Sequence, residues 1–520
     1  MERIFSKIAK AQPTRMAVTC GADSMTFGEL DRYVTILGNR LRKLGIKEGD
    51  RFCMMAKNSV QWYAMLMVAD KFGFSLVPLN YRYKFDEVNY IIGDSDAKCL
   101  FIDEERVPVF MDRRDELPEA VKSRVFCISR EKVEAEWFSP FSSLLEDADE
   151  REPEDIPHIH GATLMNYTAG TTGRPKGVIR KGMNKDVVLA MREYLADFWG
   201  YRPEDTHGVF GALYHGAPMM HAYINTVMGA SVVILPVEKG FKAEDALKMI
   251  QDHKVNTAHM VPAMFVRILD LPEETLKKYD MSSLRKVMHA AAPCPTDVKW
   301  KIMDYFGTGV VWEYYGGSEG GGTMITDEEW RKKPGSVGKP WPMAEVRIYD
   351  DDGKELPPNE IGTIYMKAGS FGFEYHKDTK KTKEAYIEGF FTMGDMGYLD
   401  EEGYLFIVDR KSDMILSGGV NIYPAEIENV IFGHSAVLDV VVFGVPDERW
   451  GEAIKAVVQL KEGQQATEEE IIQWCEERLS SIKKPKSVDF MGELPRDING
   501  KVYKRQLRDK YWAGRATKVV

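Results

Sequence analysis

The chain has 520 residues, which is too long for one ordinary hydrophobic core, so we expect two or more domains. Its composition, 44% hydrophobic and 29% charged, is typical of a globular protein. The net charge of −11 argues against a nonspecific nucleic-acid-binding protein.

The six cysteines are scattered and form no Cys-x-x-Cys pair. This disfavours a thiolate metal site and a disulfide framework, and it fits a reducing compartment. The first residues hold no apolar signal-peptide core, and no apolar run approaches the roughly 18 residues of a membrane helix. We therefore expect a cytoplasmic protein that is not an integral membrane protein. A homo-oligomer is left open.

Strands and helices alternate along the first half of the chain. An amphipathic helix is predicted to open at Thr26, with apolar residues at helical spacing from Leu30 to Leu44. The same patterns predict strands at 52–56, 75–79, 97–102, 162–167 and 257–261, and helices at 61–72 and 241–252. Such alternation predicts an α/β fold with parallel sheets.

The strand predicted at 162–167 runs into a loop rich in threonine and glycine. Glycines let backbone N–H groups converge on one point, hydroxyls donate to phosphate oxygens, and a lysine adds positive charge. It is not a Walker A loop, because Pro175 stands where the second glycine would be if counted from Gly170. The alternative is a flexible surface loop.

Residues 167–177 read Tyr-Thr-Ala-Gly-Thr-Thr-Gly-Arg-Pro-Lys-Gly. This resembles the phosphate loop of the acyl-adenylate-forming (AMP-binding) enzymes, which include acyl-CoA synthetases, aryl-CoA ligases, luciferases and adenylation domains of peptide synthetases. The chain departs from the usual pattern once, with Ala169 in place of serine. Further motifs follow in the family's order, so that the resemblance covers about residues 25 to 508.

Four later segments resemble the nucleotide motifs of that family. Residues 288–295 are similar to its adenine-binding turn, 313–320 to its Tyr-Gly-x-Thr-Glu motif, 391–398 to its ribose motif, and 404–413 to the strand with a second ribose contact. The nucleotide-binding residues that the resemblance implies are Thr168, Ala169, Gly170, Thr171, Thr172, Gly173, Lys176, Ala290, Ala291, Tyr315, Gly316, Ser318, Asp395 and Arg410. It also implies that Glu319 and Thr168 hold Mg²⁺, a hard cation that prefers oxygen ligands.

Two residues are implied to act in catalysis. His215 lies in a segment that resembles the family's aromatic-histidine motif at the carboxylate pocket, and Lys501 stands at the catalytic-lysine position of a final Pro-Arg-x-x-x-Gly-Lys motif. An isolated histidine is more often structural, and a lone lysine is usually a solvated charge. His221 has no such motif to support a role.

The resemblance implies an N-terminal AMP-binding domain at 1–411, with parallel α/β sheets and a small β-barrel-like part. A mobile α+β lid domain follows at 412–520. Ser412 takes the hinge position, usually Asp or Lys, and the turn at Ser417, Gly418 and Gly419 is implied to bind coenzyme A. In the lid, a helix at 425–432, strands at 437–443 and 453–460, and a capping-box helix from Thr467 to 479 are predicted.

The function implied is an ATP-dependent acid–thiol ligase that makes an acyl-CoA through an acyl-adenylate and uses ATP, Mg²⁺ and coenzyme A. Small residues and methionines in the predicted pocket segments, among them Met260 and Met264, favour a bulky hydrophobic acid. A bile acid, or a long-chain or alicyclic fatty acid, is the interpretation we prefer. An aryl-CoA ligase, a luciferase-like enzyme and a nucleotide-binding regulator are the alternatives.

Overall fold

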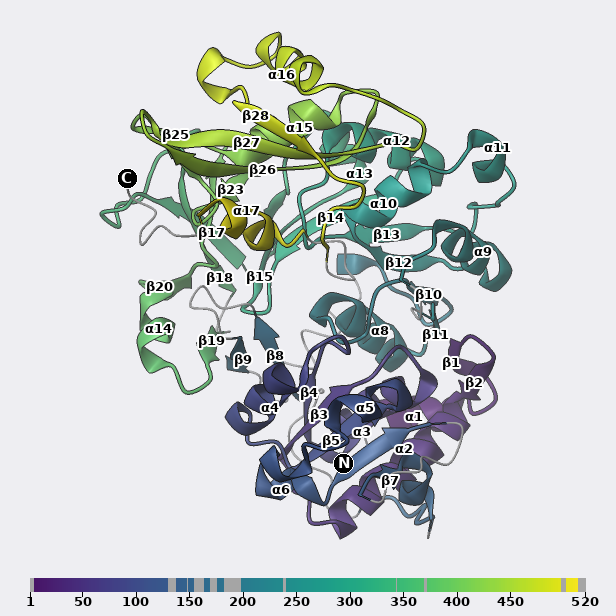
Figure 1. Cartoon of the computed structure of the whole chain (residues 1–520). Coiled ribbons are helices and arrows are strands. Elements are labelled where there is room, and N and C mark those ends of the chain that lie inside the picture. Colours follow the sequence, from purple (N-terminus) through teal and green to yellow (C-terminus); the bar gives the residue numbers. More distant parts are fainter. Residues whose placement is uncertain are drawn as a thin grey trace.

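The computed structural model describes residues 4–129, 137–146, 148–153, 163–168, 175–181, 198–236, 240–342, 344–368, 372–496 and 502–512. Four sheets organise this part of the chain, and helices cover their faces (Figure 1).

A nine-stranded sheet forms the centre of the molecule. Its order is β16 (Lys339–Pro340), β15 (Gly321–Ile325), β14 (Val311–Gly316), β13 (Lys286–His289), β12 (Thr257–Met260), β10 (Thr206–Val209), β11 (Ser231–Ile234), β1 (Met16–Cys20) and β2 (Asp23–Thr26). Strands β14 to β1 of this order run parallel, and β15, β16 and β2 add antiparallel edges. The carboxyl ends of β12, β13 and β14 therefore meet at one edge, where ligands of α/β sheets bind.

An eight-stranded sheet lies beside it. Its order is β19 (Gly372–Tyr375), β9 (Lys176–Lys181), β8 (Thr163–Thr168), β4 (Ser75–Pro78), β3 (Arg51–Met55), β5 (Cys99–Asp103), β6 (Val125–Ile128) and β7 (Ser139–Pro140). Strand β8 pairs in parallel with β4 and antiparallel with β9. The predicted phosphate loop thus leaves the parallel part of this sheet.

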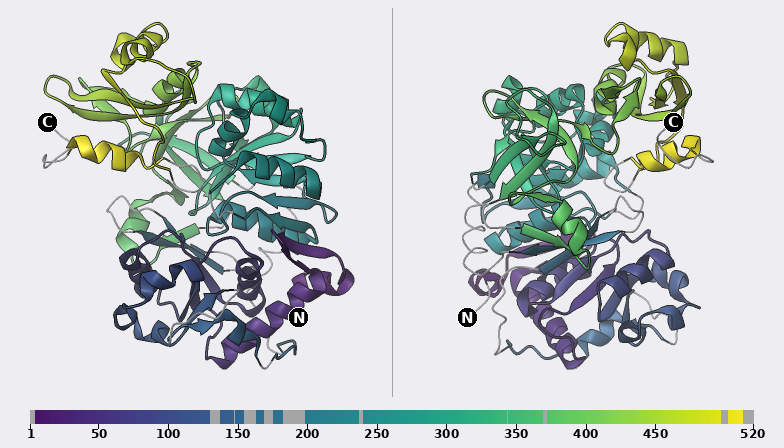
Figure 2. Two further views of the ribbon diagram at one scale, coloured as in Figure 1. Left: turned by 45° about the vertical axis from the view of Figure 1, so that its right-hand side comes forward. Right: turned by 90° about the vertical axis from the view of Figure 1, so that its left-hand side faces the viewer.

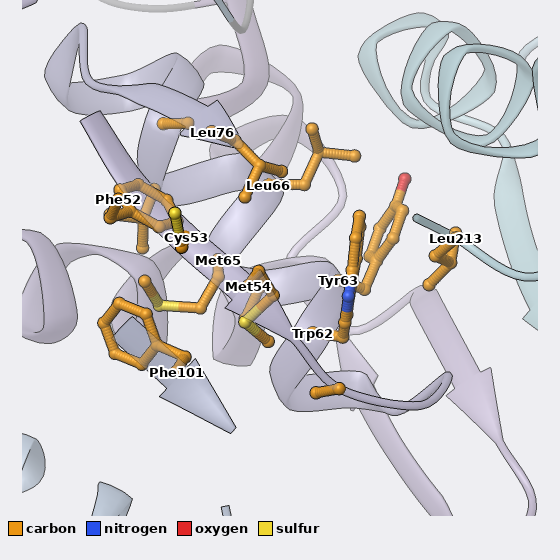
Figure 3. Packing of buried hydrophobic residues seen from close by; sticks show 14 of the residues in the cluster. Phe52, Cys53, Met54, Trp62, Tyr63, Met65, Leu66, Leu76, Phe101 and Leu213 are labelled. Atoms are coloured by element: carbon orange, nitrogen blue, oxygen red, sulfur yellow. The ribbon is translucent and has the colours of Figure 1, made fainter. Parts of the chain in front are cut away.

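One core joins the two sheets. Helix α3 (Val60–Phe72) is buried on nearly every side, which fits its continuous apolar sequence. Its side chains Trp62 and Met65 pack among strand residues such as Met54 and Phe101, and Leu213 from beyond β10 reaches the same cluster (Figure 3). The segment after β10 is therefore fixed against both sheets.

The other helices of this region follow the alternating pattern. They are α1 (Ile4–Ala11), α2 (Phe27–Lys43), α4 (Phe85–Asp94), α5 (Val107–Phe110), α6 (Glu119–Lys122), α8 (Gly216–Met228), α9 (Ala243–His253), α10 (Pro262–Leu269), α11 (Glu273–Leu276), α12 (Thr296–Phe306), α13 (Asp327–Lys332) and α14 (Thr379–Glu384). Thr26 caps α2 with Glu29 in a capping box. The prediction that Leu44 continues this helix was wrong, because Leu44 is its C-cap.

The third sheet is a small antiparallel one. It contains β17 (Ala344–Tyr349), β18 (Gly362–Ala368), β20 (Tyr386–Ile387), β21 (Phe390–Phe391), β22 (Asp395–Leu399) and β23 (Leu405–Arg410). The fourth contains β24 (Ile415–Ser417), β25 (Val420–Ile422), β26 (Val437–Asp447), β27 (Gly451–Leu460) and β28 (Ser487–Phe490), with α15 (Pro424–Phe432), α16 (Glu468–Glu476) and α17 (Lys504–Trp512). This last sheet sits on the teal and green part of the molecule and away from the purple N-terminal elements (Figure 2).

The prediction of a mixed α/β fold, with parallel sheets in a large N-terminal domain and a smaller C-terminal domain, is confirmed. The division after Lys411 stays a prediction. Helix α16 ends at Glu476, three residues before its predicted end. Within the described ranges, no helix is both long and apolar enough to cross a membrane.

Candidate functional site

The predicted phosphate loop is closed at its base by strand pairing. Thr168 ends β8, Lys176 begins β9, and the two residues are direct partners across the antiparallel ladder. The predicted loop residues Ala169, Gly170, Thr171, Thr172 and Gly173 lie outside the described residues. The two described ends therefore fix where the loop leaves and rejoins the sheet.

Lys176 is held by a partner that the sequence did not reveal. Its ammonium forms an ion pair with Asp378, whose other oxygen accepts a hydrogen bond from the backbone N–H of Lys381 at 3.0 Å and so caps α14. The hydrogen bond from Lys176 lowers the pKa of Asp378. Burial, and then the charge of Lys176, lowers the pKa of Lys381. Two cations thus lie near the base of the loop.

The turn that carries Ser318 and Glu319 is clamped to the phosphate-loop strand. Arg180 of β9 donates to the carbonyl oxygens of Gly317 and Ser318, both at 3.1 Å. Tyr375 of β19 donates its hydroxyl to Glu319 Oε1 at 3.1 Å. Because β9 pairs with both β8 and β19, the loop base and the Glu319 turn form one connected unit.

The predicted adenine and ribose residues also meet. The Tyr315 hydroxyl donates to Asp395 Oδ2 at 2.6 Å, and Arg410 Nε lies 3.3 Å from Asp395 Oδ1. Burial and the neighbouring carboxylate raise the pKa of Tyr315 well above its usual value. Tyr315 comes from the central sheet, whereas Asp395 and Arg410 are paired residues of β22 and β23. The structure therefore brings three segments of distant sequence to one place.

The predicted adenine turn follows β13. Ala290 is buried, and Ala291 has a φ of +76°, a left-handed conformation that a residue with a Cβ seldom adopts. Such strain persists where the surrounding structure imposes it, often at a binding site. Gly316 is confined in a different way, because a Cβ there would lie 2.7 Å from the backbone of Gly321.

His215 stands at the N-cap position of α8, and its ring lies 4.2 Å from that of Tyr214, centroid to centroid. A Cβ on Gly216 would lie 3.2 Å from the Asn166 amide nitrogen, two residues before Thr168 on β8. The start of α8 is therefore next to the start of the loop. A helix N-terminus favours a carboxylate, which suits the predicted role of His215.

Lys501 lies outside the described residues, but its neighbours are placed. Arg496 and Val502 form an antiparallel bridge, and the Tyr503 N–H donates to the Pro495 carbonyl at 2.8 Å. The pKa of Arg82 is raised chiefly by a hydrogen bond to Tyr81, and further by Tyr214 and Tyr503. Tyr503, two residues after Lys501, therefore lies close enough to Arg82 to affect its pKa.

The remaining predicted residues lie in or next to the fourth sheet. Ser412 occupies the turn between β23 and β24. Gly418 and Gly419 have φ of +58° and +80° and form the turn between β24, which ends at Ser417, and β25. A Cβ on Gly418 would lie 2.7 Å from the Trp450 ring. The hinge and coenzyme A assignments stay predictions.

A hydrogen bond joins the third sheet to helix α15, which lies beside the fourth sheet. Asp409 of β23 accepts a hydrogen bond from the Ala425 N–H at 3.0 Å, at the first turn of α15. Burial raises the pKa of Asp409 to about 6, against the opposing charge of Lys504, which itself lies 3.0 Å from Glu428. The side chain just before Arg410 therefore fastens α15 to the larger domain.

The oxygen atoms of Glu319 and Thr168 are suitable ligands for the predicted Mg²⁺. This ion takes one or two carboxylates together with substrate phosphates, rather than a cage made wholly of protein ligands. Over the described part of the chain, no group of three or more His, Cys, Asp or Glu residues could hold a metal ion. Glu319 with Thr168 would hold the ion only together with phosphate oxygens.

The predicted acid pocket divides into two parts. Met260 and Met264 are buried in the core formed with α10 and α12. Ala217 and Met220 of α8 pack instead against a cluster that contains Trp199, Met288 and Tyr314. An acid beside α8 would therefore meet that second cluster and not the two methionines.

Comparison with known proteins agrees with this geometry. The AMP-binding enzyme family matches residues 5–375, and the AMP-binding enzyme C-terminal domain matches residues 426–501. The chain is 32% identical to fatty acid–[acyl-carrier-protein] ligase ScoC of Streptomyces coeruleorubidus, over 98% of this chain and 96% of that protein. It is 31% identical to a feruloyl-CoA synthase of Amycolatopsis sp., over 97% of each chain.

Among solved structures, ATP-bound MatB from Rhodopseudomonas palustris superposes with a TM-score of 0.84, at 27% identity, over 98% of this chain and 99% of that one. The similarity thus extends through both domains. This chain belongs to the AMP-binding enzyme family, and it has acid–thiol ligases among its relatives.

Proposed function

We propose that the protein is an AMP-forming acyl-CoA ligase, which joins a hydrophobic carboxylic acid to coenzyme A through an acyl-adenylate. The observation that carries this proposal is the path of β14 and the turn after it. Tyr315 reaches Asp395 at one end of this path, and Glu319 is tied to the phosphate-loop strand at the other. One ATP molecule laid along it would meet Tyr315, Asp395 and the turn of Ser318 and Glu319.

In the first half-reaction, a carboxylate oxygen of the acid attacks the α-phosphorus of ATP, and the bond to pyrophosphate breaks. Negative charge grows on the phosphoryl oxygens and must be met by fixed cations and dipoles. Lys176, the loop N–H groups and Lys501 supply these, and Mg²⁺ at Glu319 would neutralise phosphate charge. The start of α8 and His215 orient the carboxylate.

In the second half-reaction, the thiolate sulfur of coenzyme A attacks the acyl carbon, and AMP leaves. We assign Lys501 to the first step and the turn of Ser417, Gly418 and Gly419 to the second. The lid at 412–520 would rotate at Ser412 against the domain at 1–411. This rotation would move Lys501 away from the reacting groups and bring the turn of Ser417 to Gly419 toward them.

We favour a bulky hydrophobic acid, because the pocket segments are rich in small residues and methionines. A bile acid is the narrower choice, because residues 373–378 and 417–428 resemble those of fatty-acid, bile-acid and sterol-side-chain CoA ligases. The relatives add a fatty acid and ferulate as candidates, and a carrier-protein thiol as an alternative acceptor. We place the enzyme in the cytoplasm, because all six of its cysteines are free thiols. We place it in lipid metabolism, because a fatty acid ligase is among its relatives.

The test is pyrophosphate release with a panel of acids, each measured with and without coenzyme A. We expect release with Mg²⁺ and ATP, a thioester product by mass spectrometry when coenzyme A is added, and no release after chelation of the metal. Fatty acids, cinnamates and bile acids form the panel, and an acyl carrier protein replaces coenzyme A in one arm. ATP binding with no turnover of any acid would contradict the proposal.

A further inference from the structure

Two lysine side chains lie over one tyrosine ring at the base of the predicted phosphate loop. The ammonium nitrogens of Lys176 and Lys381 are 6.0 and 5.4 Å from the centroid of the Tyr375 ring. Lys176 begins β9, Tyr375 ends β19, and Lys381 follows on α14, so the pairing of β19 with β9 brings the three side chains together (Figure 1). A motif assigns Lys176 to phosphate, whereas no motif singled out Lys381.

The positive charge at this point exceeds the negative charge that the chain supplies. Among the described residues, the charges that act most on Lys381 are those of Lys176, Asp378 and Glu319. Asp378 is shared, because one of its oxygens pairs with the Lys176 ammonium and the other accepts the Lys381 backbone N–H at 3.0 Å. With Glu319 assigned to Mg²⁺, one carboxylate is left to two ammonium groups. A further anion is therefore attracted to this point.

The position of the two ammonium groups along the nucleotide path indicates which phosphates they reach. The Tyr315 hydroxyl bonds Asp395 at 2.6 Å, at the predicted ribose end. Glu319 follows four residues later in the chain, and it accepts the Tyr375 hydroxyl at 3.1 Å. A nucleotide with its ribose at Asp395 and its metal-bound phosphates at Glu319 therefore ends beside the Tyr375 ring. The phosphates farthest from the ribose are the ones that meet both lysines.

Resting on the proposed function, we propose that Lys381 is a second lysine that binds the β- and γ-phosphates of ATP, and hence the pyrophosphate that leaves in the first half-reaction. In that step the bond between the α-phosphorus and its bridging oxygen breaks, and the electron pair stays with the pyrophosphate. Lys381 and Lys176 meet the charge that the pyrophosphate gains. The acyl-adenylate that remains keeps only the α-phosphate and makes no contact with Lys381.

The test compares nucleotides that differ in these two phosphates. Lys381→Gln removes the charge and retains a polar side chain. By isothermal titration calorimetry with Mg²⁺, we expect the Kd of ATP and that of pyrophosphate to rise by about 10- to 100-fold, the loss that one charge-assisted hydrogen bond gives. The Kd of AMP should stay within about twofold of its value in the unmodified protein. Both nucleotides are titrated into one preparation, so a general loss of folded protein cannot change the ratio of their Kd values.

Two further variants show whether the charge itself is responsible. Lys381→Arg restores a cation and should recover most of the preference for ATP over AMP. Lys383→Gln is the matched control, because Lys383 lies on the same helix and is exposed, and it should leave the ratio unchanged.

An unchanged ratio of Kd values in Lys381→Gln, or equal losses of ATP and AMP binding, would overturn the inference. The proposed function would still stand in that case, because it depends on turnover of an acid by the unmodified enzyme. Failure of the unmodified protein to bind ATP would overturn both proposals.

Discussion

The two proposed half-reactions should depend differently on the positive charge of Lys501, near the end of the chain. Lys501→Ala should slow acyl-adenylate formation by about 10²–10³, the usual loss for one fixed transition-state contact. It should have much less effect on the reaction of a supplied acyl-adenylate with coenzyme A. Single-turnover kinetics of each step would measure both rates. Equal losses in the two steps, or no loss in the first, would remove Lys501 from the proposed role.

Residue identities were easier to predict than residue partners. The motifs predicted Tyr315, Asp395 and Arg410 to be adenine and ribose contacts, and this role stays a prediction. The structure does bring the three side chains together. The same motifs gave no sign that Lys176 is paired with Asp378, 202 residues later. That contact depends on β19 pairing with β9, which no local pattern encodes. His221 had no motif to support it, and only the packing of α8 shows its neighbours.

At the scale of elements, Arg180 couples the phosphate-loop strand to the Glu319 turn. Arg180→Leu would remove two charge-assisted hydrogen bonds to the carbonyls of Gly317 and Ser318. Bonds of this kind contribute at most about 1.5–3 kcal/mol each, and less here because the Arg180 side chain is exposed to solvent. We expect KM for MgATP to rise by about tenfold or more, with a smaller change in KM for the acid.

The control is Lys181→Leu, because Lys181 is the next residue of the same strand and its side chain is 57% exposed. Steady-state kinetics with varied MgATP would compare the two variants. Equal KM values for MgATP in both would show that the clamp by Arg180 has no part in nucleotide binding.

A buried ion pair joins α12 to β14 directly behind the predicted adenine turn. Lys299 and Glu313 are both less than 7% exposed and in direct contact. Lys299→Met leaves a buried carboxylate without its partner, which typically costs about 3–5 kcal/mol of unfolding free energy. The double variant Lys299→Met/Glu313→Leu should recover most of this loss. Urea unfolding midpoints would test both changes.

The pH dependence of the single variant has a definite sign. Burial raises the pKa of Glu313, so its contribution to stability is lost as pH rises through that pKa. Without Lys299, this pKa should rise further. The destabilisation relative to the unmodified protein should therefore be larger at pH 8 than at pH 5. A loss of stability in Lys299→Met that does not change with pH would show that the Glu313 carboxylate does not cause it.

The order of strands and helices along the chain could be predicted from the sequence. Which strands pair with one another in the sheets could not. Apolar runs and capping residues are local, and they predicted β3, β4, α3, α15 and the capping box of α16. The placement of β1 beside β11 joins residues more than 200 positions apart. Such pairings depend on the packing of the shared core around α3, which alternating patterns do not specify.

For the whole molecule, the contact of Asp409 with α15 should make the placement of the lid depend on pH. The pKa of Asp409 is raised to about 6 by burial, so the stability that it gives to this arrangement is lost as pH rises through about 6. Lys504 and Glu428 act on the pKa of Asp409 and are included in this balance, whereas Asp413 raises the pKa of Lys504. We expect the lid to leave this placement more readily at pH 7.5 than at pH 5.

Fluorescence energy transfer between dyes on Lys354→Cys and Glu469→Cys would report the placement of the lid. Both positions are exposed, and five of the six native cysteines are buried. Asp409→Ala should abolish the change between pH 5 and pH 7.5, whereas Asp413→Asn in the following turn should preserve it. The same pH response in Asp409→Ala would assign the effect to another group.

The burial of the cysteines has a consequence for an enzyme that makes activated acyl groups. An acyl-adenylate transfers its acyl group to any accessible thiolate, including those of the enzyme itself. Burial raises the pKa of Cys53 and Cys127 to about 12, and it also raises that of Cys294, which lies in the predicted adenine turn. Thiolates are therefore scarce inside the protein, including in the predicted adenine turn. We therefore expect little self-acylation of the enzyme, so that the acyl group is left for the thiol of the second substrate.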